Sequence, residues 1–92
     1  MKSTTKHLEP ELELGEIVIS KEILGMFSLS DILKAITYHK KGEIVRSFLV
    51  SWLICRVTTG TKQWTHLNKC GMAMVIVTDT ARGVTVLFSS RQ

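Results

Sequence analysis

Two of the three histidines and both cysteines of this 92-residue chain could bind zinc or act as a base and a nucleophile. His39, Cys55, His66 and Cys70 form no Cys-x-x-Cys and no His-x₃₋₅-His pair, which are the spacings that indicate a zinc site. On a helix, His66 and Cys70 would share one face, but no acidic residue stands near them to orient the base. No glycine-rich phosphate loop or Gly-x-Ser-x-Gly elbow occurs. We therefore expect no enzyme, no metal and no cofactor.

The basic residues indicate nucleic-acid binding instead. Lys40 and Lys41 precede a predicted helix, whose first backbone N–H groups could help them to hold a phosphate. Lys62 and Gln63 follow Gly60 at the tip of a predicted hairpin, where lysine can contact phosphate and glutamine can read an adenine edge. The expected contacts are Lys40, Lys41, Arg46, Arg56, Lys62 and Gln63, with Arg82 as a further candidate.

The charge pattern agrees with this interpretation. The chain has a net charge of +4, and five of its eight acidic residues lie before residue 23. The part from residue 23 onward carries nine lysines and arginines, so it can attract phosphate over a Debye length of roughly 8–10 Å. The apolar run 47–55 is too short to cross a bilayer, and the polar N-terminus has no apolar signal region. We expect no membrane contact and a cytoplasmic location, where both thiols stay reduced.

The first half of the chain contains signals for a strand and for two helices. Apolar positions over 12–19 predict a strand, with a bulge at Gly15, and residues 26–27 are expected to form a short return strand. Ser28-x-x-Asp31 resembles a helix N-cap, and the apolar residues that follow it have helical spacing. A second helix is expected over 43–55, with Trp52 on its buried side.

The second half reads mainly as strands. Residues 57–65 predict a hairpin that turns at Gly60. Residues 72–77 and 84–88 are rich in β-branched side chains and flank a plausible loop, so composition predicts a second hairpin. Helical spacing of Leu67, Cys70, Met74 and Val77 leaves helices open for the same stretch. The expected fold class is α+β, with two or more helices packed on a small antiparallel sheet.

Two short blocks resemble the signature of the KilA-N family, a DNA-binding module of phages and large DNA viruses. The first block is Phe27 to Ala35, and the second is Gly60 to Leu67, in which Leu67 replaces the usual proline. Phe48-Leu49 resembles a pair in the second helix of the family. The resemblance implies a winged-helix-like fold, a helix pair in the last third, and structural roles for Trp64 and His66. Residues 1–10, which end at the only proline, are expected to form a flexible arm, and residues 11–92 one compact KilA-N-like domain.

The resemblance also implies a function. We expect a regulator of repressor or antirepressor type, encoded by a phage or mobile element, that contacts duplex DNA through a basic helix and a hairpin wing in the cytoplasm of a bacterial host. The alternative is a small stoichiometric inhibitor of a host nucleoprotein complex, similar to an anti-CRISPR protein. An exposed apolar patch would favour that alternative, whereas a basic groove between helix and hairpin would favour DNA. A homodimer stays open.

Overall fold

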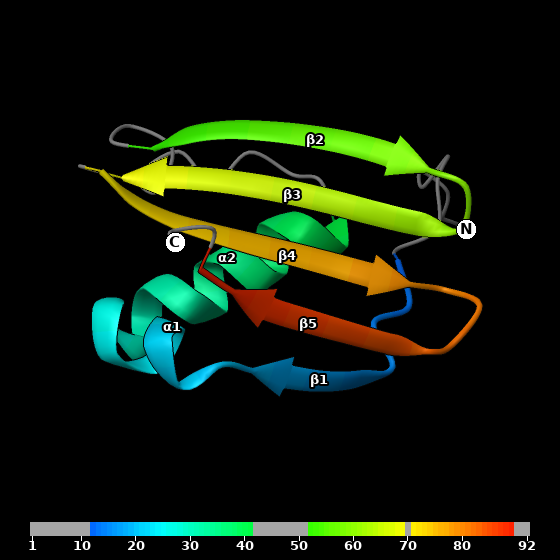
Figure 1. Ribbon diagram of the computed structural model, residues 1–92, viewed down its shortest axis with the longest axis horizontal. Helices are drawn as coiled ribbons and strands as arrows, with labels where there is room; N and C mark the ends of the chain where they lie inside the picture. The colour runs from blue at the N-terminus through cyan, green and yellow to red at the C-terminus, as the bar shows by residue number, and fades with distance from the viewer. Residues whose placement is uncertain (1–11, 42–51, 70, 90–92) are drawn as a thin grey trace, which may run out of the picture.

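A computed structural model describes residues 12–41, 52–69 and 71–89 of the chain, which form an α+β fold (Figure 1). The predicted fold class is confirmed. The predicted arm, 1–10, lies outside the described residues. The elements follow one another as β1 (Glu16–Ile19), α1 (Lys21–Met26), α2 (Leu29–Lys41), β2 (Leu53–Thr59), β3 (Lys62–Lys69), β4 (Met72–Asp79) and β5 (Val84–Phe88).

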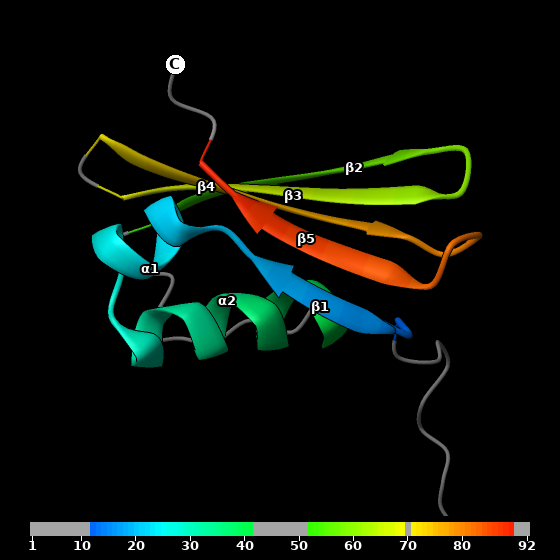
Figure 2. The same ribbon diagram turned by 60° about the horizontal axis from the view of Figure 1, so that its bottom comes forward.

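The strands form one five-stranded sheet in the order β1-β5-β4-β3-β2. Strands β2 to β5 are a simple antiparallel meander, and β1 pairs in parallel with β5, so that Ile17 lies beside Thr85. Both helices lie against the same face of the sheet (Figure 2). Since neighbouring residues of a strand point to opposite faces, this arrangement divides the sheet into a helix-covered face and an open face.

Both hairpins predicted from composition are confirmed. The β2–β3 hairpin turns at Gly60, which has a φ of 60°. The β4–β5 loop is held by the Asp79 carboxylate, which accepts the Ala81 N–H at 3.1 Å, and by Gly83 at a φ of 68°. The helices that the family resemblance implied for this stretch are therefore wrong. Its β-branched residues favour the pleated, half-buried surface of a strand over a helix.

The helix after Ser28 is confirmed as α2, because the Ser28 hydroxyl accepts the Asp31 N–H at 3.1 Å and caps the first turn. Lys40 and Lys41 form its last turn, and the helix N-terminus that they are expected to precede falls within residues 42–51, outside the described part. The return strand expected at residues 26–27 is also wrong. Ser20 accepts the Ile23 N–H at 3.3 Å and starts α1 there instead.

Two further boundaries differ from the prediction. Residues 53–55 open β2, so the helix expected over 43–55 does not reach its predicted end, and residues 42–51 lie outside the described part. Strand β1 begins only at Glu16, because Gly15 has a φ of 64° and lies tight against the backbone of Gly83. A side chain at position 15 would overlap the Gly83 carbonyl oxygen, so this close approach requires glycine.

The core fills the layer between the helices and the sheet. Its buried apolar side chains come from α1, α2, Phe27 between these helices, the residue before β2, and the helix-covered positions of β3, β4 and β5. Trp52 is 6% exposed and stacks on Phe27 with the ring centroids 5.5 Å apart, which confirms its expected core position. Among the described helices, neither has the length and apolar character needed to span a bilayer.

Candidate nucleic-acid interface and buried polar network

Three elements that carry predicted contacts lie toward one end of the molecule. Figure 1 shows the C-terminal end of α2, the β2–β3 turn and the β4–β5 loop at the same end of the sheet. The loop and the turn are joined directly, because the Thr80 N–H and hydroxyl both donate to the Thr61 carbonyl, at 3.0 and 2.9 Å. The carbonyl of Lys40 accepts the Leu12 N–H at 3.1 Å, which attaches the end of α2 to the segment before β1. We call this region the basic end; its predicted contacts are Lys40, Lys41, Lys62 and Arg82.

Arg56 connects the hairpin to the helix. Its guanidinium lies 5.9 Å from the centre of the Tyr38 ring, so a cation of β2 packs over an aromatic side chain of α2. Tyr38 stands two residues before Lys40. The fold therefore brings basic residues of the helix and of the hairpin, which are far apart in the sequence, to the same side of the sheet.

The remaining predicted contacts differ in their surroundings. Gln63 is half-buried on the helix-covered face, and its carbonyl oxygen accepts the Thr58 hydroxyl at 3.2 Å. Arg82 is highly exposed and its Nε lies 3.8 Å from the Asp79 carboxylate. Arg46 lies outside the described residues. Lys40 and Lys41 stand on α2 and Arg56 contacts that helix, whereas Lys62 lies on the open face opposite Asp79.

A fully buried polar network lies behind this end. His39 of α2 has no exposed surface, and its Nδ1 and Nε2 atoms lie 2.7 Å from the Thr65 hydroxyl and 2.8 Å from the Thr78 hydroxyl. The Thr78 and Thr85 hydroxyls are 2.6 Å apart, and Thr85 donates to the Leu14 carbonyl at 2.7 Å. The network joins α2, β3, β4, β5 and the segment before β1, and within the described residues no buried side-chain polar atom lacks a partner.

The hydrogen bonds determine where each proton lies. Thr85 uses its only hydrogen on the Leu14 carbonyl, so Thr78 must donate to Thr85. The Thr78 oxygen then accepts from His39, which places the imidazole proton on Nε2. Nδ1 is left as the acceptor of the Thr65 hydroxyl. The geometry therefore assigns the Nε2–H tautomer to the neutral ring of His39.

The charge state of His39 follows from the same surroundings. Burial, and to a smaller extent the nearby positive charge of Arg56, lower the pKa of His39 from 6.5 to about 4. Sequence reasoning considered His39 only as a zinc ligand. His39 follows Ile32 and Ala35, which are both buried on α2, at helical spacing. This spacing is the sequence signal that places His39 on the core side of the helix.

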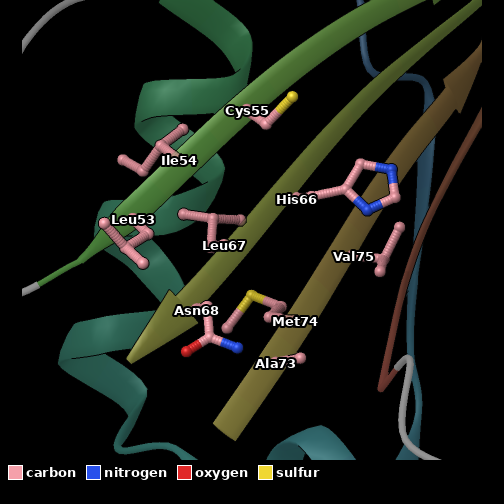
Figure 3. Close-up of a pocket in the computed structure, with 9 residues that line it drawn as sticks. All are labelled: Leu53, Ile54, Cys55, His66, Leu67, Asn68, Ala73, Met74 and Val75. Atoms are coloured by element: carbon pink, nitrogen blue, oxygen red, sulfur yellow. The ribbon is translucent and has the colours of Figure 1, made fainter. Parts of the chain in front are cut away.

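The open face of the sheet has a different character. Its exposed apolar side chains include Val18, Leu53 and Val57, at 45, 76 and 46% exposure. Between β2, β3 and β4 this face contains a hollow of about 310 Å³, shown in Figure 3. Cys55 and His66, which are cross-strand partners, are both exposed and line the hollow.

The candidate zinc ligands are not brought together. His39 is buried between α2 and the sheet, whereas Cys55 and His66 point to the open face; Cys70 lies outside the described residues. In the described ranges no group of three or more His, Cys, Asp or Glu residues could hold a metal ion. Trp64 stacks on His66 with the ring centroids 6.2 Å apart, so this histidine packs along its own strand. Comparisons with protein-family models, curated proteins and solved structures give no match.

Proposed function

We propose that the protein is a DNA-binding regulator of a phage or mobile element, acting in the host cytoplasm and contacting duplex DNA through its basic end. The observation that carries this proposal is the contact between Arg56 of β2 and Tyr38 of α2. It places a hairpin cation beside the helix end that carries Lys40 and Lys41. Basic residues of the helix and of the hairpin on the same side of the sheet support DNA over a protein partner.

The chemistry of the contact differs from that of a helix N-terminus. Lys40 and Lys41 lie at the C-terminal end of α2, where the helix dipole is negative and stabilises their charges. The backbone there offers no free N–H groups to a phosphate, so the lysine ammonium groups themselves must make the contact. Such contacts give affinity without base recognition, and the affinity falls steeply as salt rises.

The test is a fluorescence-anisotropy titration of a random duplex at several salt concentrations. The double variant Lys40→Ala/Lys41→Ala removes two phosphate contacts, so it should weaken binding to every duplex and reduce the salt slope by about two. The matched control is Lys21→Ala/Lys34→Ala, which removes the same charge from α1 and from the middle of α2. It should change the slope much less.

Two results would contradict the proposal. One is absence of binding by the wild-type protein at low salt. The other is an equal loss of slope in both double variants, which would show attraction by net charge alone rather than by the basic end. The apolar patch that would favour a protein partner is also present, on the open face.

A further inference from the structure

The open face of the sheet has the composition of a buried surface. Strand β4 is apolar at every position from Met72 to Val77, so both its helix-covered and its open positions are apolar. Such runs are typical of strands that are covered on both faces, whereas a sheet with one face in water alternates apolar and polar residues. Val86 and Val18 extend the apolar surface onto β5 and β1, and no described element covers it (Figure 2).

The charges of this face limit what can cover it. Its described strand positions carry Lys62 and Asp79, which are direct cross-strand partners, and Glu16 at the edge of the sheet. The face is therefore nearly neutral, although the whole chain has a net charge of +4. Nucleic acid would find little to bind here. Two copies of the chain repel each other through most of their surface, but not through this face.

The size of the face suits a second copy. The five strands lie about 4.8 Å apart, and the longest has eight residues with a rise of about 3.3 Å each. The area of the open face is therefore roughly 500 Å², because β1 and β5 are shorter than the other strands. Two such faces would remove about 1,000 Å² from water, the lower end of what a specific interface buries. Aligned sheets pack face to face about 10 Å apart, as in β-sandwiches.

We infer that two copies of the protein associate through their open faces in a symmetric sheet-on-sheet dimer with a dissociation constant in the micromolar range. The hollow between β2, β3 and β4 then lies inside the interface, and Cys55 is covered. The inference does not rest on DNA binding, because Lys40 and Lys41 of the basic end lie on α2, away from the open face, and only Lys62 belongs to both surfaces. The Lys40→Ala/Lys41→Ala variant should accordingly keep its ability to dimerise.

Sedimentation equilibrium from low to several hundred micromolar protein measures the association directly. Wild-type protein should approach twice the mass of the chain. Val57→Glu places a carboxylate on the open face at a position that is already 46% exposed, so the monomer should fold while the dimer weakens at least about tenfold. Leu33→Glu is the matched control, since Leu33 is 54% exposed on α2, on the other side of the molecule. It should leave the association unchanged.

Cys55 supplies a second readout. In a Cys70→Ser background it is the single remaining thiol, and its reaction with a maleimide should slow as protein concentration rises. Val57→Glu should abolish this protection. A wild-type protein that stays monomeric at the highest concentration, or a dimer that Leu33→Glu weakens as much as Val57→Glu, would overturn the inference. The first result would assign the open face to a different protein, and the second would place the interface on the helices.

Discussion

His39 should make the folding stability of this protein fall with acid. Its pKa is about 4 in the folded chain and 6.5 when unperturbed. Protonation would place a second proton on the ring, at Nδ1, where Thr65 now donates its own hydrogen. The hydroxyl would have to turn away, and a charge would be buried beside Arg56. The folded protein therefore binds a proton at His39 more weakly than the unfolded chain does.

The magnitude follows from linkage. Above pH 6.5 His39 is neutral in both states, and its contribution to stability is fully present. As the pH falls from 6.5 towards 4, the unfolded chain binds the proton and the folded protein does not, so stability is lost. The complete loss is about 3 kcal/mol, of which about 2 kcal/mol is gone by about pH 5.

The assay is urea unfolding followed by circular dichroism at pH 7 and at pH 5. In His39→Gln the amide can still donate to Thr78, but Thr65 loses its acceptor, so the variant should be less stable at pH 7 by about 1–3 kcal/mol. Between pH 7 and pH 5, the free energy of unfolding of this variant should not show the decrease that His39 causes in the wild-type protein. The control is His66→Gln, because His66 is exposed on the open face and has no part in the network.

A wild-type protein whose unfolding free energy changes no more between pH 7 and pH 5 than that of His39→Gln would refute the argument. Should the variant fail to fold, NMR of the imidazole in wild-type protein gives an independent answer. The ring should remain neutral at pH 5 and carry its proton on Nε2. A ring that titrates near pH 6.5, or a proton on Nδ1, would show that the hydrogen-bond network is assigned wrongly.

Two further predictions concern local structure. Gly15→Ala should destabilise the protein by about 3 kcal/mol or more, measured by thermal unfolding, because the new Cβ overlaps the Gly83 carbonyl. The control is Gly60→Ala, because Gly60 also has a positive φ but its new Cβ would meet no atom within 4 Å. This variant should lose only about 1–2 kcal/mol of stability. Equal costs would show that the contact with Gly83 does not matter. Ser28→Ala removes the hydroxyl that caps α2 and should cost about 1 kcal/mol, measured by urea unfolding, whereas Ser30→Ala, inside the helix, should cost less. No difference between the two serine variants would contradict the capping role.

The sequence predicted best where the signal is local. The cap at Ser28, the turn at Gly60 and the β-branched runs of β4 and β5 each depend on residues within a few positions of one another, and all are confirmed. The family resemblance predicted less well over the last third, where composition was correct. Local sequence patterns did not predict α1, because Gly25 and the short segment around it are equally compatible with a turn.

By itself, the sequence determined the fold class, the two hairpins, the helix α2 and the excess of basic residues. Only the tertiary structure decided which residues meet. His39 and Thr78 are 39 positions apart, and no local pattern links a histidine on a helix to hydroxyls on three strands. The same holds for Arg56 over Tyr38 and for the open face, because covering one side of the sheet with both helices leaves the apolar residues of the other side without a partner in the described chain. These features depend on how the elements pack, and packing joins residues that the chain itself keeps far apart.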